Sequence, residues 1–264
     1  MTSLDQFAPN SNTWPLFSFA ILPHFAESLA ALEDLAEKED WEFRHTTSTR
    51  PRPVLFNYIQ YTFARLEEQC KITISRNGEH ACWNSGLVTE HQEAIYLVFD
   101  LNKFPDDTRK WHFRKFCRRG ERDLNVFPKL PEMATYFEEP SCLVFDCGLD
   151  FRPNIEHIVE DHRLRFPAPF NTMEGYALQT NIKGAIENAR ERVRRSYKTA
   201  IPQFYQGRVQ LLLPLCLSKP TTADLALVVE RFDGFYHAAT CLQLDMAYNN
   251  ARQLARPDRD WLQP

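Results

Sequence analysis

The chain has 264 residues, of which 44% are hydrophobic and 25% charged, and this balance excludes a disordered or collagen-like polypeptide. Its 31 Lys and Arg against 35 Asp and Glu give a net charge of −4, so any contact with a polyanion must come from a local patch. The longest apolar run, Leu211 to Leu217, is too short to cross a bilayer, so we expect no membrane span.

The N-terminus and the cysteines both indicate a cytoplasmic protein. The first basic residue is Lys38, so the chain lacks the charged start of a secretory signal. Seven cysteines are scattered without a C-x-x-C pair, which predicts neither a disulfide framework nor a zinc ribbon. We therefore expect a reducing compartment and no disulfide-linked partner.

The N-terminal region is predicted to be helical. Apolar residues recur at helical spacing between Pro23 and Lys38, and again from Leu55 to Leu66 after a Pro-rich segment. We expect these two helices to precede any sheet.

The middle of the chain reads as antiparallel sheet. Two β-prone runs, 71–75 and 80–84, flank the hairpin signal Asn77-Gly78. Further strands are predicted over 94–101, 110–117 and 141–147, and a short helix over 154–161.

A basic helix is predicted between Asn181 and Lys198. One stripe is apolar, and a neighbouring stripe at the same spacing carries Lys183, Arg190, Arg194 and Lys198 with one acidic residue. The stripe is interpreted either as a solvated face with an i,i+4 ion pair or as an anion-binding face.

Three consecutive strands are predicted near the C-terminus, over 208–217, 223–232 and 235–246. Asp233-Gly234 joins the last two with a type I′ turn signal, which sets their register. Because side chains alternate along a strand, the predicted pairs on one face are Phe232–Phe235, Glu230–His237, Val228–Ala239, Ala226–Cys241 and Asp224–Gln243.

That face combines small residues with Asp224, Glu230, His237, Gln243 and Asp245, whereas Leu225, Leu227 and Val229 form the core on the other side. One hypothesis is that the basic helix covers this polar face and neutralises its acids. The other is that the acids and bases form a phosphate-ester site, with carboxylates as metal ligands or general base.

The motifs from Tyr197 to Tyr205, from Gln210 to Leu217, from Ala223 to Arg231 and from Leu244 to Arg252 resemble the domain of unknown function 3825 family. The resemblance runs from the segment starting at Leu16 to Trp261. It implies one family domain over 1–264, with a helical part at about 14–70 and the sheet and basic helix at about 71–264.

The resemblance also implies an RNA context, since members resemble stand-alone proteins or lie beside cold-shock-type RNA-binding domains. Trp83, Ser85 and Phe204 depart from the family motifs, and His237 is outside them, so it is left out of the expected site. Carried over by position, the polar motif residues are Asn84, His157, Arg165, Lys198, Gln203, Tyr205, Asp224, Glu230, Arg231, Asp245, Asn249, Asn250 and Arg252.

Two functions are weighed for an RNA or nucleotide partner. The first is a phosphoester-cleaving enzyme in which Glu230 and Asp245 hold a divalent metal ion or act as general base, with His157 as proton donor. Substrate and phosphate would be bound by Lys198, Arg252, Arg194, Asn249, Asn250, Gln203, Tyr205, Asn84 and Arg165. The alternative is a non-catalytic RNA-binding module in which Tyr197, Tyr205 and Tyr248 stack on bases.

The predicted fold class is α+β, with N-terminal helices packed on a mostly antiparallel sheet that ends in the three C-terminal strands. Strand signals come in hairpin-connected runs rather than alternating with helices, and this excludes a doubly wound parallel sheet.

Overall fold

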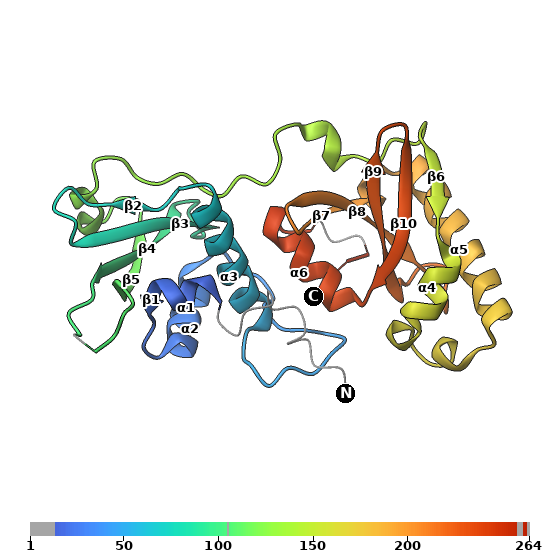
Figure 1. The fold of residues 1–264 in the computed structure, drawn as a ribbon, viewed down its shortest axis with the longest axis horizontal. Helices are drawn as coiled ribbons and strands as arrows, with labels where there is room; N and C mark the ends of the chain where they lie inside the picture. Colours follow the sequence, from blue (N-terminus) through green and yellow to red (C-terminus); the bar gives the residue numbers. More distant parts are fainter. Residues whose placement is uncertain (1–13, 105, 258–260, 263–264) are drawn as a thin grey trace. The chain divides into compact units, whose positions relative to one another are not determined.

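The computed structural model describes residues 14–104, 106–257 and 261–262, which divide into two compact units. The N-terminal unit contains the residues up to Glu42 and Ser48–Thr135, and the C-terminal unit contains Phe43–Thr47 and the residues from Tyr136. Each unit has its own five-stranded sheet (Figure 1). Six α-helices in the described residues complete an α+β fold, which confirms the predicted class.

The N-terminal unit begins with three helices. They are α1 (Pro15–Phe19), α2 (Phe25–Leu35) and α3 (Pro53–Glu68), so both predicted helices are present. Phe63 of α3 packs against Trp83 of the sheet, with ring centroids 5.7 Å apart. The apolar stripe of α3 thus covers one face of that sheet.

The sheet of the N-terminal unit has the order β1-β5-β4-β3-β2. β1 runs parallel to β5, and the remaining neighbours are antiparallel. The expectation that two helices precede any strand is wrong, because the two-residue β1 lies between α1 and α2. The bounds are β1 (Ala20–Ile21), β2 (Thr73–Ile74), β3 (His80–Val88), β4 (Ala94–Leu101) and β5 (Trp111–Arg118).

The sheet of the C-terminal unit has the order β6-β10-β9-β8-β7, with β6 parallel to β10 and the other pairs antiparallel. The strand predicted over 141–147 is wrong, because this segment begins in the short 3-10 helix η3 (Pro140–Leu143). The bounds are β6 (Asp150–Pro153), β7 (Ile201–Tyr205), β8 (Arg208–Leu215), β9 (Leu225–Phe232) and β10 (Phe235–Leu242).

One face of this sheet is filled by α4 (Ile155–Asp161) and α5 (Gly175–Arg195). The apolar stripe of α5 packs on Leu225, Leu227 and Val229, which are fully or almost fully buried as predicted. The hypothesis that α5 covers the polar face is therefore wrong. Two of its arginines pair within the helix instead, Arg190 with Glu187 and Arg194 with Glu191.

The predicted register of β9 and β10 is correct beside the turn and wrong beyond it. Phe232 pairs with Phe235 and Glu230 with His237, but a β-bulge then shifts the register by one residue. Val228 therefore lies opposite Thr240 instead of Ala239, and Ala226 opposite Leu242 instead of Cys241. The turn is also not type I′, since Gly234 has positive φ and Asp233 does not.

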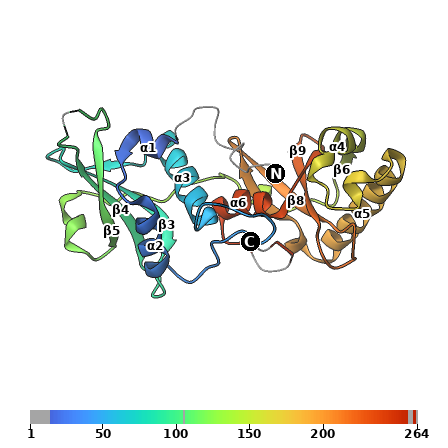
Figure 2. The same cartoon turned by 90° about the horizontal axis from the view of Figure 1, so that it is seen from below.

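The third predicted strand ends early, because β10 stops at Leu242 and α6 (Leu244–Leu254) follows. The prediction that Gln243 and Asp245 lie on the sheet face is therefore wrong. Asp224 also lies outside the strands, where its carboxylate accepts hydrogen bonds from the backbone of Leu217 and Ser218 and from the Ser218 hydroxyl. Figures 1 and 2 show α5 and α6 on opposite sides of this sheet.

No helix in the described ranges is both long enough and apolar enough to cross a membrane. All seven cysteines fall within those ranges, and each is a free thiol. The first finding agrees with the expectation of no membrane span, and the second with the expectation of no disulfide framework within the chain.

Gly86 tests the packing of α3 on β3. It has a φ of +75°, and a Cβ there would lie 2.5 Å from Tyr58 Oη, which donates a hydrogen bond to the Ser85 carbonyl. We predict that Gly86→Ala lowers the free energy of unfolding by about 3 kcal/mol, through backbone strain and loss of that bond. Gly78→Ala is the matched control, since its φ is +74° with open space around it, and should cost only about 1 kcal/mol in urea melts. Equal losses for the two variants would contradict this account.

Candidate nucleic-acid interface

The face of the C-terminal sheet opposite α5 presents a row of aromatic and cationic side chains, which we call the turn row: Tyr205, Arg208, Phe232 and Phe235. Tyr205 pairs with Arg208, and Phe232 pairs with Phe235. β8 and β9 pair as Leu211 with Val229, and continuing that register sets Arg208 level with Phe232. The four residues thus form one line across four strands, beside the two hairpin turns.

A second row lies two residues further along each strand, about 7 Å away, and we call it the polar row: Gln203, Gln210, Glu230 and His237. Gln203 pairs with Gln210, and Glu230 with His237. Glu230 therefore lies on this face as predicted, together with His237 and Gln210, which were not among the predicted site residues.

Planar groups are stacked along the turn row. The Phe232 and Phe235 rings lie 5.2 Å apart at an angle of 10°, and the Arg152 guanidinium lies 4.0 Å from the centroid of Phe235. Phe232 and Tyr205 are each 40% exposed, which is high for such large side chains. This surface offers aromatic groups to a planar ligand.

An ion pair joins the two rows. Arg208 Nη1 lies 2.7 Å from Glu230 Oε1, with the arginine side chain 70% and the glutamate 27% exposed. Such an exposed pair adds little stability, but it fixes where the carboxylate points.

The β7 end of the polar row is covered by α6. Asn250 Nδ2 donates to Gln203 Oε1 at 3.2 Å, and Gln203 Nε2 donates to Gln210 Oε1 at 2.8 Å. Gln203 is only 1% exposed, so it positions Gln210 rather than meeting a ligand itself. The structure thus brings together Gln203, Asn250, Tyr205 and Glu230 from the predicted site.

The predicted residue Arg165 lies at the edge of β10, whereas His157 lies on α4, where its Nδ1 is 2.5 Å from Asp161 Oδ2. Arg165 Nη1 donates to the Cys241 carbonyl at 2.6 Å, and His162 Nε2 lies 2.8 Å from the Thr240 hydroxyl. Burial lowers the pKa of His162, and Arg165 and His157 lower it further. These bonds fasten the segment after α4 to β10, beyond the point where β6 ends.

Asp245 has a different environment from Glu230. It is fully buried in the first turn of α6, and its carboxylate accepts from the backbone amides of Arg44 and His45 at 3.2 and 3.1 Å and from the Thr46 hydroxyl at 2.7 Å. A buried carboxylate with such charge-assisted bonds holds the 43–47 segment in the C-terminal unit.

The other predicted residues are dispersed. Asn84 belongs to the N-terminal unit, where its side chain accepts from the Gly86 amide at 2.9 Å in the irregular part of β3. Arg194 lies on α5, and Lys198 is exposed in the 3-10 turn η6 (Tyr197–Thr199). Asn249 and Arg252 are buried residues of α6, as is Tyr248, whereas Tyr197 is 67% exposed.

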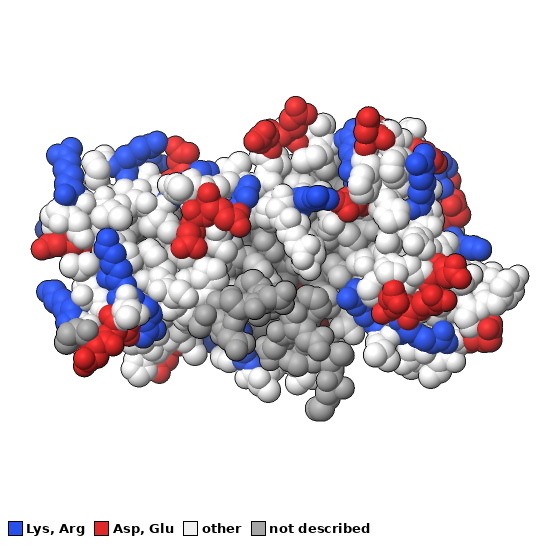
Figure 3. Space-filling view, viewed as in Figure 1, with Lys and Arg blue, Asp and Glu red and all other residues white. Residues whose placement is uncertain are grey.

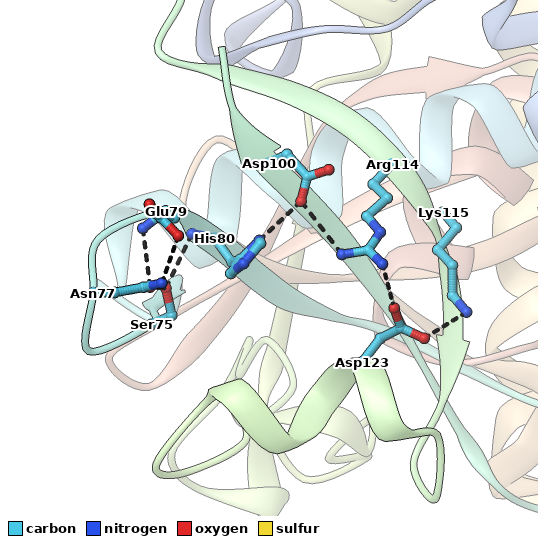
Figure 4. A network of polar contacts seen from close by, with 8 residues as sticks. All are labelled: Ser75, Asn77, Glu79, His80, Asp100, Arg114, Lys115 and Asp123. Carbon is cyan, nitrogen blue, oxygen red and sulfur yellow. Dashed lines mark hydrogen bonds and ion pairs between the residues drawn. The ribbon is translucent and has the colours of Figure 1, made fainter. Parts of the chain in front are cut away.

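In the part of the chain that is described, the closest grouping of metal-ligand types is Cys117, Glu121 and Asp123. The Lys115 ammonium lies 2.8 Å from both carboxylates, so it already supplies the positive charge there. Figure 4 shows Lys115 and Arg114 meeting at Asp123, with Arg114 reaching on to Asp100. This network is an internally neutralised ion-pair system.

Asp245 and Glu230 should respond differently to the same substitution. We predict that Asp245→Asn destabilises the protein by about 2 kcal/mol or more, because the amide group places a donor against backbone N–H groups. Glu230→Gln should change stability by less than about 1 kcal/mol, because its partner is exposed. Thermal and urea melts of the two variants decide this, and equal losses would contradict the assigned environments.

Comparison with known proteins gives one result. No curated protein and no solved structure matches the chain. A family model described as a domain of unknown function (DUF3825) matches residues 32–261 and spans both units. The chain therefore belongs to the DUF3825 family.

Proposed function

We propose that the protein is a binding module for single-stranded RNA, with the turn row as its base-stacking surface. The observation that carries the proposal is the line of Tyr205, Arg208, Phe232 and Phe235 across four adjacent strands, with two of its aromatic rings 40% exposed. Sheet faces that carry aromatic side chains across neighbouring strands bind RNA by stacking on splayed bases.

Cations next to the stack suit an RNA backbone. The Arg208 side chain is 70% exposed and the Arg152 side chain 58% exposed, and both belong to strands of the same sheet. Lys and Arg are interspersed with Asp and Glu on the molecular face in Figure 3. A local contact of this kind agrees with the net charge of −4, which provides no general attraction for polyanions.

The carboxylates favour binding over cleavage. Asp245 uses its oxygens to hold the 43–47 segment, and Glu230 is paired with Arg208. The grouping of Cys117, Glu121 and Asp123 found among the described residues includes neither of them, nor His157. We therefore place the phosphoester-cleaving enzyme second, as an outcome that the binding experiment can reveal.

Substitutions in the turn row should weaken RNA binding without unfolding the protein. We predict that Phe232→Ala and Tyr205→Ala each reduce affinity for a mixed-sequence single-stranded 12-mer by about 5- to 100-fold, since stacking contributes roughly 1–3 kcal/mol per base. Fluorescence anisotropy measures the affinity. Tyr176→Ala is the control, because Tyr176 is 78% exposed on α5, which packs against the opposite face.

Failure of the parent protein to bind any single-stranded RNA would overturn the proposal. Gel analysis of the same RNA, incubated with Mg²⁺, Mn²⁺ or Zn²⁺, tests the second function. RNA cleavage that survives the turn-row substitutions would replace the binding module with an enzyme whose site lies elsewhere.

Arg208 should contribute to the salt dependence of the affinity for RNA. We predict that Arg208→Gln makes the plot of log affinity against log salt less steep by about one unit, because one phosphate contact is lost. Arg194→Gln serves as the charge-matched control, since Arg194 lies on α5, which packs against the opposite face of the sheet. An unchanged slope for the Arg208 variant would place the phosphate contacts outside the turn row.

A further inference from the structure

We propose that Glu230 and Gln210 make the surface selective for guanine, an inference that rests on the proposed RNA-binding function. The two residues are neighbours on β9 and β8 in the polar row. They follow the turn row on the same sheet face, so they lie where an edge of a stacked base would point.

The direction of the stack determines which groups a base would meet. Phe232, Phe235 and the Arg152 guanidinium stack sideways across β9, β10 and β6, and Arg208, whose side chain pairs with Glu230, follows Phe232 on the β8 side. A base that continues this stack would stand over β8 and β9. Glu230 lies two residues along β9 from Phe232, and Gln210 lies two residues along β8 from Arg208.

The hydrogen-bonding groups of the two side chains are complementary. Gln210 Oε1 accepts from Gln203, so its amide nitrogen is the group left to donate to a base. Glu230 only accepts, and Arg208 holds its Oε1 while each carboxylate oxygen retains further lone pairs. The pair therefore presents a donor beside a charged acceptor.

Guanine has the edge that fits this pair best. Its N1–H and N2 amino groups are adjacent donors for one carboxylate, and its O6 is an acceptor for an amide N–H. Adenine and cytosine offer one amino group to the carboxylate, and uracil offers a single N–H flanked by carbonyls. A carboxylate also repels phosphate, which keeps the backbone on the Arg208 side of the base.

The test uses U-rich single-stranded 12-mers that differ at one central position, which is guanine, inosine or adenine. Inosine lacks only the N2 amino group. We expect the guanine RNA to bind about tenfold more tightly than the other two, the lower part of the range for a good bidentate contact. Glu230→Gln should remove the difference in affinity between the guanine RNA and the inosine RNA.

Glu187→Gln is the control, because Glu187 is an acid on α5 that pairs with Arg190. It should keep the full preference for guanine. Equal binding of all three RNAs by the parent protein would overturn the guanine inference and leave RNA binding standing. A preference that persists in Glu230→Gln would also overturn it, whereas absence of all RNA binding would overturn the proposed function itself.

Discussion

The register of two β-hairpins determines what the C-terminal unit can do. The turns at Gln206-Gly207 and Asp233-Gly234 pair Tyr205 with Arg208 and Phe232 with Phe235, and the β8–β9 ladder aligns the two pairs. A slip by one residue in either hairpin would move its part of the row to the face filled by α5. Because α5 buries the aliphatic face, the aromatic and polar side chains remain on the other one. The stability of the C-terminal unit and the proposed recognition of RNA thus depend on the same alternation of side chains between the two faces of the sheet.

Much of the fold could be predicted because its signals are local. Helical periodicity predicted α2, α3, α4 and α5, and a two-residue turn predicted the pairing next to it. Long-range partners decided the rest: β1 and β6 are short parallel strands that exist only through β5 and β10. The bulge in β10 and the start of α6 were missed because the alternating apolar residues after His237 also fit a continuous strand.

The site was predicted in part. Glu230 could be assigned to its face because alternation alone decides this for a strand. Gln203 and Tyr205 entered the predicted site through the family resemblance, since no strand was predicted over the residues of β7. Asp245 could not be assigned, since its role follows from amides of Arg44 and His45, which are about 200 residues away in the chain. His237 and Phe232 were undervalued because family resemblance directs attention to shared motifs, whereas exposure of a ring can be known only from the structure.

Base stacking on the turn row is tested most directly by ultraviolet cross-linking of the intact protein to single-stranded RNA. Mass spectrometry then maps the modified residues. Aromatic rings that stack on bases are well placed to cross-link. If the turn row stacks on bases, adducts should form on Tyr205, Phe232 or Phe235, within the peptides of the β7–β8 and β9–β10 hairpins. Adducts confined to the N-terminal unit, or to α5 and Tyr197, would contradict this prediction, because the base-stacking surface would then lie outside the turn row.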